Sequence, residues 1–346
     1  MAYTTIDDPS EYFQTALWTG TGSSQTITND GNSDLKPDWI WIKCRSNTRD
    51  HVLLDSTRGG TKALTSNTSG AEATDGAITS FNTDGFTHSG QNAYGGNSET
   101  HVGWQWKANG GTTSSNTDGD ITSTVQANNT AGFSIVTYTA NGSNTDTVGH
   151  GLSKQLSMVF TKKRNGARSW HVGHKDMPFN SASNAHNGYI SLDTTNANEP
   201  SNGGRANIPN ATTFQGESSD GDTMVAYCFA EIQGYSKFGK YTGNGSTDGP
   251  FVYTGFKPAW LIRKRTDTTG AWLIQDNKRP GSNRPLVNSL PTGNNVLRAN
   301  DNSAEEFNNE IDILSNGFKC RATDTFGNAS GGTYIYMAFA EHPFVS

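Results

Sequence analysis

The stretch Trp39-Ile-Trp-Ile-Lys43 decides the fold, because two similar stretches follow it at intervals of roughly a hundred residues. They are Met158-Val-Phe-Thr-Lys162 and Trp260-Leu-Ile-Arg-Lys264. Short apolar runs that contain aromatic and β-branched residues, with polar turns on both sides, are typical of β-strands. The sequence therefore predicts one kind of strand that recurs three times along the chain.

Two further marks surround each copy in the same order. A phrase rich in Gly and Thr precedes the strand, as Trp18-Thr-Gly-Thr-Gly22, Tyr138-Thr-Ala-Asn-Gly142 and Tyr241-Thr-Gly-Asn-Gly245. An apolar run closes the repeat, as Val102-Gly-Trp-Gln-Trp-Lys107, Val225-Ala-Tyr-Cys-Phe-Ala-Glu231 and Ile335-Tyr-Met-Ala-Phe-Ala-Glu341. This period is too long for a solenoid and suits a small domain.

We therefore predict an all-β protein of three tandem β-sandwich modules, each of jelly-roll or concanavalin-like type. The expected boundaries are an N-terminal segment at 1–11, module 1 at 12–108, module 2 at 133–234 and module 3 at 235–346. Residues 109–132 are expected to form a flexible linker and an opening strand, because Asn109–Gly119 has a linker composition and 121–125 alternates. We expect module 3 to fold when produced alone.

Composition excludes several classes of protein. The chain has 346 residues and a formal net charge of −6, without a basic stripe, which argues against nucleic acid as a partner. No apolar stretch is long enough to insert into a membrane, and the N-terminus does not resemble a signal peptide. The 35 aromatic residues argue against disorder. Cys44, Cys228 and Cys320 are expected to be buried free thiols of a protein folded in a reducing cytoplasm.

An Asp/Arg pair is the first candidate binding feature. Asp276 lies twelve residues after Lys264, and Arg279 follows three residues later. Module 1 repeats the pattern with Asp55 and Arg58. Such a pair either contacts a ligand at the edge of the module or pins a turn through an ion pair, and the second alternative is favoured because it needs no ligand.

Aromatic side chains are the second candidate. Trp170 and Trp272 are expected near loops, where an exposed ring can stack on a sugar. Tryptophans two residues apart, such as Trp39 and Trp41, share one face of a strand and are expected in the core. Trp170, Trp272, Asp276 and Arg279 are thus the candidate binding residues.

We expect no catalytic residues, metal site or cofactor. Glu231 and Glu341 end equivalent repeats, so they are expected to pair with Lys162 and Lys264 and not to form a catalytic carboxylate pair. The histidines are expected to be polar surface residues without metal-ligand spacing. Asp-Gly turns, such as the one at Asp248-Gly249, leave calcium binding open.

The phrases from Tyr241 to Pro258 and from Gly331 to Phe344 resemble a repeat family of marine tailed bacteriophages, including cyanophages. The opening from Met1 to Phe13 is also similar to the start of such proteins. This resemblance covers nearly the whole chain and is strongest in module 3. It implies a virion structural or tail-fibre-like protein with lectin-like β-sandwiches, and it brings no catalytic residues.

From this resemblance we expect a bacteriophage virion protein, exposed on the tail or capsid surface after synthesis in the host cytoplasm. The first interpretation is a tail fibre or tail-associated receptor-binding protein that recognises a host surface polysaccharide without turnover. One alternative is a capsid or baseplate decoration protein that contacts other virion proteins. The other is a polysaccharide depolymerase. A homo-oligomer is expected, with a trimer favoured by analogy with phage fibres and because the chain offers few interior apolar residues.

Overall fold

The protein is all-β, as predicted, in a computed structural model that describes residues 4–143, 145–177, 188–200, 210–216, 219–279, 294–308 and 310–343. The helices in these ranges are a 3-10 turn, η1 (Pro9–Glu11), and one short α-helix, α1 (Asn92–Gly95). The strands form three sheet assemblies in chain order, which we call assemblies 1, 2 and 3.

Assembly 1 has a main sheet in the order β1 (Phe13–Thr19), β9 (Thr100–Trp106), β3 (Trp39–Cys44) and β4 (Val52–Asp55). A smaller outer sheet contains β2 (Gln25–Ile27), β8 (Phe86–His88) and β7 (Ile78–Phe81). A short hairpin pairs β5 (Lys62–Ala63) with β6 (Ala73–Thr74).

Assembly 2 has an eight-stranded main sheet. Its order is β10 (Ser114–Asn116), β11 (Ser123–Asn128), β12 (Phe133–Thr139), β19 (Thr223–Phe229), β14 (Met158–Lys163), β15 (His171–His174), β16 (Gly188–Ser191) and β17 (Glu199–Pro200). β13 (Thr147–Gly149) and β18 (Thr213–Gln215) form the small outer sheet. Part of the segment expected to be a flexible linker is therefore strand β10, which pairs with the opening strand β11.

Assembly 3 has a six-stranded main sheet. Its order is β20 (Ser236–Thr242), β28 (Thr333–Pro343), β22 (Phe256–Arg265), β23 (Trp272–Asp276), β24 (Asn294–Arg298) and β25 (Glu306–Asn308). The outer sheet has the order β21 (Phe251–Tyr253), β27 (Gly317–Cys320) and β26 (Ile311–Leu314).

One four-strand order recurs in all three main sheets. β1-β9-β3-β4 corresponds to β12-β19-β14-β15 and to β20-β28-β22-β23. The antiparallel registers also correspond: Trp39 pairs with Trp106, Met158 with Phe229, and Trp260 with Phe339. The sequence repeat is thus a repeat of strand order and register.

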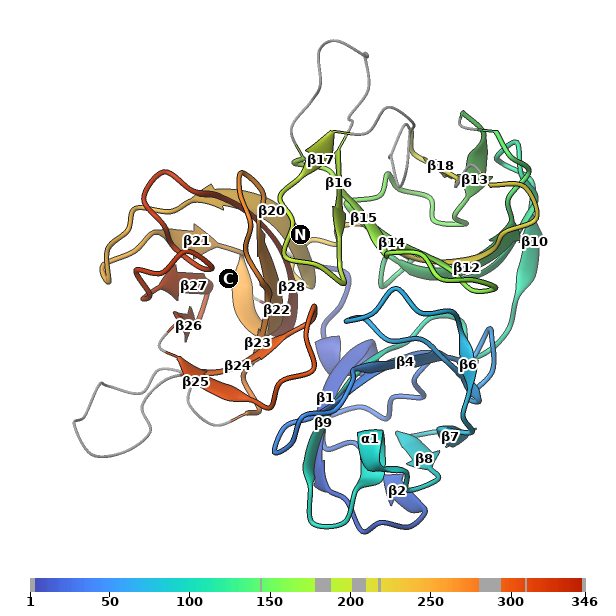
Figure 1. The fold of residues 1–346 in the computed structure, drawn as a ribbon, viewed down its shortest axis with the longest axis horizontal. Coiled ribbons are helices and arrows are strands. Elements are labelled where there is room, and N and C mark those ends of the chain that lie inside the picture. The colour runs from blue at the N-terminus through green and yellow to red at the C-terminus, as the bar shows by residue number, and fades with distance from the viewer. Residues whose placement is uncertain are drawn as a thin grey trace.

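The three main sheets surround a common centre, which is visible where the assemblies meet in Figure 1. Three equivalent residues meet there: the ring centroids of Trp106, Phe229 and Phe339 lie 5.8–6.4 Å apart. Trp39 stacks on Tyr227 across the junction of assemblies 1 and 2, with centroids 4.3 Å apart. One aromatic cluster therefore joins all three assemblies.

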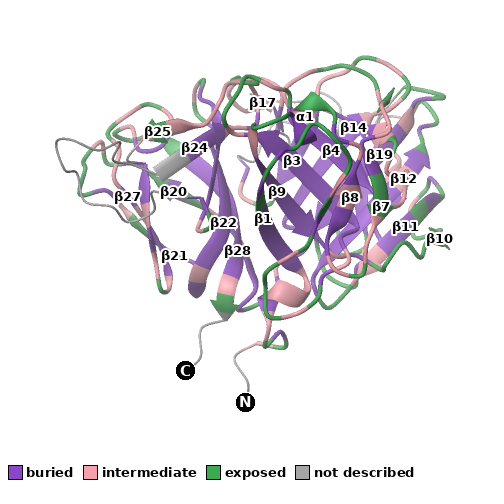
Figure 2. Ribbon diagram, turned by 90° about the horizontal axis from the view of Figure 1, so that it is seen from below, coloured by how far each residue is buried: buried purple, intermediate pink, exposed green. Residues whose placement is uncertain are grey.

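Each main sheet is covered on both faces. One face packs into the central cluster, and the other packs against the outer strands of its own assembly. Strands covered on both faces read as continuous apolar runs, which explains why β3 and β14 show no clear polar alternation. Figure 2 shows this as a buried interior, with η1 and the end of β28 at one end of the molecule and α1 at the other.

Two expectations change with this architecture. The chain buries a large apolar core by itself, so a shortage of interior apolar residues is not a reason to expect a trimer. Six histidines expected at the surface are buried: His51, His88, His101, His150, His171 and His174. They lie in or beside strands that are packed between the central cluster and the outer sheets, so neighbouring segments cover them. His186 lies outside the described residues. All three cysteines are buried free thiols, as predicted.

Candidate functional site

Asp276 and Arg279 form a buried ion pair at the junction of assemblies 3 and 1. The Arg279 Nε donates to Asp276 Oδ2 at 2.6 Å, and both side chains are 0% exposed. Asp276 Oδ2 also accepts from the indole N–H of Trp104 at 3.0 Å. The pair pins its turn, because Asp276 Oδ1 accepts from the Arg279 backbone N–H. Because both side chains of the Asp276–Arg279 pair are buried, the alternative that the pair contacts a ligand at the edge of the module is wrong.

The same junction occurs twice more around the centre. In assembly 1, Asp55 Oδ2 accepts from the hydroxyl of Tyr227 in assembly 2, at 2.8 Å. In assembly 2 the Asp position holds His174, whose Nδ1 accepts from the backbone, so its Nε2–H donates to the Tyr336 carbonyl of assembly 3 at 3.2 Å. The polar end of β4, β15 and β23 thus contacts the next assembly each time, in a cyclic order.

Trp170 and Trp272 are core residues, which corrects the prediction that they bind ligand. Their exposed fractions are 0% and 1%. The Trp170 indole donates to the Thr65 carbonyl at 2.8 Å, and the Trp272 indole donates to the Ser191 carbonyl at 2.9 Å. Each indole thereby bonds to the preceding assembly. The sequence placed these rings near loops correctly, but the neighbouring assembly covers them.

The repeat lysines are buried, and two of them donate across a junction. Lys43, Lys162 and Lys264 are fully buried, and burial lowers their pKa values to about 8, about 8 and about 7. Lys162 Nζ donates to the Ser69 carbonyl of assembly 1 at 2.8 Å, and Lys43 Nζ donates to the Asn302 carbonyl of assembly 3 at 3.2 Å. Backbone carbonyls, which carry no charge, replace the glutamates that we expected as partners.

Glu231 and Glu341 pair elsewhere. Glu231 contacts Lys175 and Lys237, each at 2.6 Å, and Glu341 contacts Lys257 at 2.5 Å. The expected pairs with Lys162 and Lys264 are therefore wrong. The reason is geometric: the closing strand runs antiparallel to the lysine strand, so the glutamate and the lysine lie at opposite ends of the sheet.

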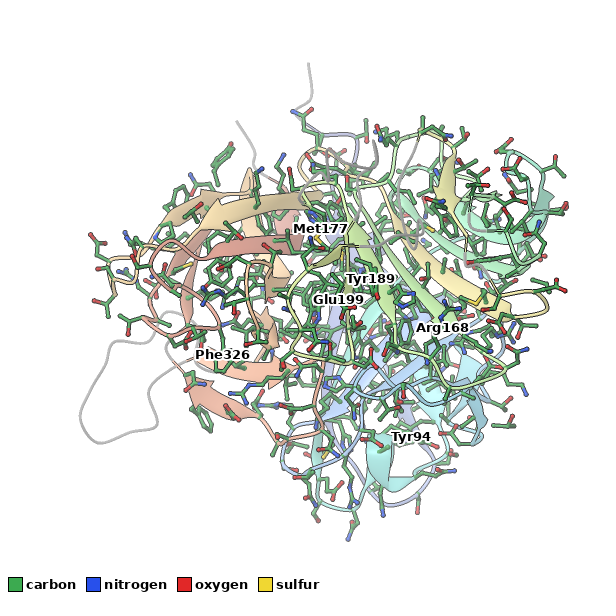
Figure 3. The ribbon with its side chains drawn as sticks, turned by 45° about the horizontal axis from the view of Figure 1, so that its top comes forward. Tyr94, Arg168, Met177, Tyr189, Glu199 and Phe326 are labelled. Atoms are coloured by element: carbon green, nitrogen blue, oxygen red, sulfur yellow. The ribbon has the colours of Figure 1, made fainter. Side chains whose placement is uncertain are left out.

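Polar contacts at the junction of assemblies 2 and 3 continue toward the surface. Tyr189 and Glu199 lie side by side there in Figure 3, and the Tyr189 hydroxyl donates to Glu199 at 2.8 Å. The Tyr189 ring also packs edge-on against His171, with centroids 4.5 Å apart. These contacts join β16, β17 and β15, so they order an edge of the sheet and do not form an open site.

Exposed aromatic rings mark a different place. Phe251 and Tyr253 lie on the edge strand β21, with 45% and 54% of their surfaces exposed. They are two residues apart in a strand, so both project from the same face while Val252 is buried between them. Two large rings exposed on one face of an edge strand form an apolar patch of the kind found at interaction sites.

A groove of about 280 Å³ begins at Tyr253. Its lining comes from the segment that joins assemblies 2 and 3, from the start of β20 and from the end of β21: Glu231, Gln233, Gly234, Ser236, Lys237, Tyr253 and Thr254. The Glu231 carboxylate is partly buried, which raises its pKa, but Lys175 and Lys237 outweigh this effect and hold the pKa below its usual value. The groove therefore offers a carboxylate, an ammonium group and an amide next to an exposed ring.

A second cavity of about 180 Å³ lies between assemblies 1 and 3. Asp30, Glu341 and Lys278 are among its lining residues, and Lys278 Nζ contacts Asp30 Oδ1 at 2.8 Å.

A third feature is a group of possible metal ligands, Cys44, Glu99 and His101, at one end of β3 and β9. Strand pairing brings these residues together from 55 positions apart, so sequence spacing alone did not indicate them.

Sequence reasoning also missed Phe251 and Tyr253, although the signal was present. The alternation of Phe251, Val252 and Tyr253 is typical of a strand, but which of its faces stays uncovered depends on the outer sheet of assembly 3. No helix among the described residues has the length and apolar character that crossing a membrane requires.

Comparison with known proteins gives one family. Neither a curated protein nor a solved structure matches the chain. The family match runs through all three sheet assemblies without a break, so the unit that the family describes is the whole arrangement and not a single repeat. The chain belongs to the family described as Domain of unknown function (DUF7483), whose model matches residues 8–343.

Proposed function

We propose that the chain is a saccharide-binding protein of a tailed-phage particle, without turnover, and that the groove beside Tyr253 is its binding site. The observation that carries this proposal is the exposed pair Phe251 and Tyr253 on an edge strand, next to a polar groove. An aromatic ring offers an apolar face to the C–H groups of a sugar while polar neighbours bond its hydroxyls. The assignment to a phage particle, and the choice of host polysaccharide as the ligand, both rest on the resemblance to phage repeat proteins.

The groove supports binding better than catalysis. Glu231 is its one carboxylate among the described lining residues, and two lysines neutralise it. Glycoside hydrolysis uses two carboxyl groups about 5–10 Å apart. A shallow site of this kind suits weak recognition, with a dissociation constant of about 1 mM, worth about 4 kcal/mol. Many copies on one particle would supply the avidity.

Binding to host polysaccharide tests the proposal. Tyr253→Ala and Phe251→Ala should each weaken adsorption of the purified protein to host cells or host polysaccharide by about tenfold, or about 1.4 kcal/mol. Phe307→Ala is the matched control, because Phe307 is 52% exposed on β25 and lies outside the groove. If the three variants bind alike, the groove is not the site. If the wild-type protein shortens the polysaccharide, the depolymerase interpretation replaces this one.

One observation favours the decoration protein as a second candidate. A single chain already arranges three similar sheets around one centre, with η1 and the end of β28 at the same end of the molecule (Figures 1 and 2). One such chain could occupy a position on a three-fold symmetry axis of the particle, because its three similar sheets approximate that symmetry without a trimer. Electron cryo-microscopy of intact particles distinguishes the two, because density on a capsid three-fold position supports decoration and density at the tail supports attachment.

A further inference from the structure

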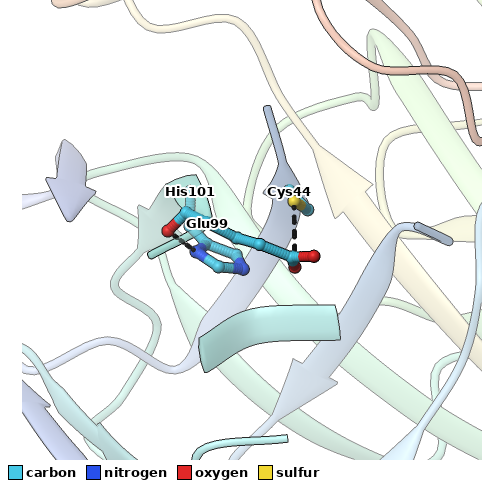
Figure 4. A group of neighbouring side chains, drawn as sticks. All are labelled: Cys44, Glu99 and His101. Atoms are coloured by element: carbon cyan, nitrogen blue, oxygen red, sulfur yellow. Dashed lines mark hydrogen bonds between the residues drawn. The ribbon is translucent and has the colours of Figure 1, made fainter. Parts of the chain in front are cut away.

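Cys44, Glu99 and His101 lie together where β3 ends and β9 begins (Figure 4). Cys44 and His101 are direct partners in the register of the two strands, and Glu99 comes just before β9. One ligand atom from each residue lies within 4.8 Å of the other two. The Cys44 thiol contacts Glu99 Oε2 at 3.5 Å. A thiol, a carboxylate and an imidazole thus converge on one small volume.

His101 has a nitrogen that needs a partner. Its ring is fully buried and stacks on Trp18, with centroids 5.4 Å apart. Nδ1 lies 3.1 Å from the Glu99 carbonyl, whereas Nε2 is buried and forms no hydrogen bond of full geometry among the described residues, and the ring's other backbone interaction is with Asn92. Burying a polar atom without a partner costs free energy, so an unpaired imidazole nitrogen beside a thiol and a carboxylate indicates a ligand.

Assembly 2 shows what occupies the equivalent place. Lys163 follows Lys162 as Cys44 follows Lys43, and Asp222 precedes β19 as Glu99 precedes β9. Lys163 Nζ contacts Asp222 Oδ1 at 2.6 Å, and Arg168 contacts the other oxygen at 3.5 Å.

Assembly 1 keeps the equivalent arginine but not the lysine. Arg49 contacts Glu99 Oε1 at 2.8 Å, whereas the lysine position holds the Cys44 thiol. Glu99 Oε2 accepts from the Arg49 Nε at 3.3 Å and contacts the Cys44 thiol at 3.5 Å, so the lysine that lies 2.6 Å from Oδ1 of Asp222 has no equivalent in assembly 1.

We propose that Cys44, Glu99 and His101 bind a zinc-type divalent metal ion at this position. Thiolate and imidazole ligands select zinc over magnesium and calcium, which prefer oxygen ligands. Ligands about 2.0–2.3 Å from a tetrahedral zinc lie about 3.3–3.8 Å from one another, so the three side chains need to close by about 1 Å. Arg49 and Asn47 each donate to Oε1 at 2.8 Å and fix the carboxylate. Oε2 is the oxygen that would bind the metal, because its contacts with the Arg49 Nε and the Cys44 thiol are longer, at 3.3 and 3.5 Å.

The fourth ligand is water. An open groove lined by Thr48, Arg49, Asp50, Gln91, Asn92, Ala93 and Asn302 lies against this cluster, since Arg49 bonds directly to Glu99. Three protein ligands and one water are the composition of a zinc site with an exchangeable position, which is buried here because Cys44 and His101 are 0% exposed and do not line the groove.

Metal binding by the purified full chain tests the inference. The protein is reduced, stripped with a chelator and titrated with Zn²⁺ against a chromophoric chelator, and separately with Co²⁺. We expect one Zn²⁺ per chain, and a Co²⁺ spectrum with a thiolate charge-transfer band and intense tetrahedral d–d bands. Cys44→Ala should weaken Zn²⁺ binding at least tenfold and abolish the charge-transfer band. Cys228→Ala is the matched control, because Cys228 is another buried thiol, in assembly 2.

A second variant keeps the result decisive if Cys44→Ala misfolds. Cys44→Lys rebuilds the pair seen between Lys163 and Asp222, so it should fold, show no zinc-dependent rise in Tm, and lose the cobalt band. Zinc should raise the Tm of the wild-type protein and of Cys228→Ala. The inference is overturned if folded wild-type protein binds no Zn²⁺ at micromolar concentration. It is equally overturned if Cys44→Lys binds Zn²⁺ as tightly as the wild type.

Discussion

Replacing Asp55 with Ala should destabilise the whole protein and not only assembly 1. Asp55 Oδ2 accepts from Arg58 Nε at 2.5 Å and from the Tyr227 hydroxyl at 2.8 Å. Both members of the Asp55–Arg58 pair are 0% exposed. Without the carboxylate, Arg58 keeps Glu72 at 2.7 Å but loses its closest counterion, and Tyr227 loses its acceptor across the junction.

The expected loss is about 3–5 kcal/mol, the usual cost of removing one partner of a buried ion pair. At a denaturant dependence of about 3 kcal/mol/M, this moves the urea midpoint by about 1 M or more. Because one aromatic cluster joins the three main sheets, opening assembly 1 exposes the central faces of the other two. Unfolding should therefore remain a single transition, displaced to lower urea.

Urea titration followed by far-UV circular dichroism and by tryptophan fluorescence measures the shift, and hydrogen exchange reports each strand. β28 of assembly 3 should lose protection as much as β3 of assembly 1. Asp248→Ala is the control, because Asp248 is 85% exposed in its pair with Lys319 and should change stability by less than about 1 kcal/mol. Two separate transitions, or unchanged protection of β28 when β3 opens, would refute the shared-core reasoning.

Four further outcomes are expected. Trp272→Ala should cost about 3–5 kcal/mol in urea denaturation, because it removes a buried ring; a stable variant with weaker polysaccharide binding would contradict this. Burial lowers the pKa of His150 to about 4, so the unfolded state binds more protons between pH 4 and 6.5 and stability falls as the pH drops through that window. His150→Gln should remove about 2 kcal/mol of the loss between pH 7 and pH 5, and an unchanged profile would oppose it. Burial lowers the pKa of Lys264 to about 7, so the unfolded state binds more protons than the folded state between pH 7 and about 10.5, and the free energy of unfolding should rise with pH there. Lys264→Met should reduce this rise by up to about 1.4 kcal/mol per pH unit. The shared core reverses the expectation that module 3 folds alone: residues 235–346 by themselves should expose the central face that carries Trp260 and should aggregate or bind a hydrophobic dye, and a monomeric fragment that unfolds cooperatively would contradict the shared core.

Sequence reasoning succeeded where short-range patterns decide the structure. Trp39-Ile-Trp-Ile-Lys43 and its copies became β3, β14 and β22, because apolar runs between polar turns form strands whatever they pack against. Asp276 follows Lys264 by twelve residues, as Asp55 follows Lys43, and in both places the structure has two antiparallel strands joined by a turn. The favoured interpretation of Asp276 and Arg279 as an ion pair that pins a turn was also correct.

The candidate binding site was not predictable in this way. Trp272 begins the short strand β23 and Tyr253 ends the short strand β21, and a position at the end of a short strand does not by itself decide whether a ring is buried. Trp272 is buried because assembly 2 covers β23, whereas Tyr253 stays exposed because β21 is the edge of an outer sheet. Exposure of a side chain depends on which distant segment covers it, and no local pattern encodes that.

By itself the sequence determined an all-β chain in which one strand pattern recurs three times, because turn residues and apolar runs act over a few positions. Only the tertiary structure decided that the three main sheets share one core, that Asp55 reaches Tyr227 of the next assembly, and that Cys44 meets His101. These contacts join residues far apart in sequence. Their geometry follows from how complete sheets pack to exclude water, which depends on the whole chain at once.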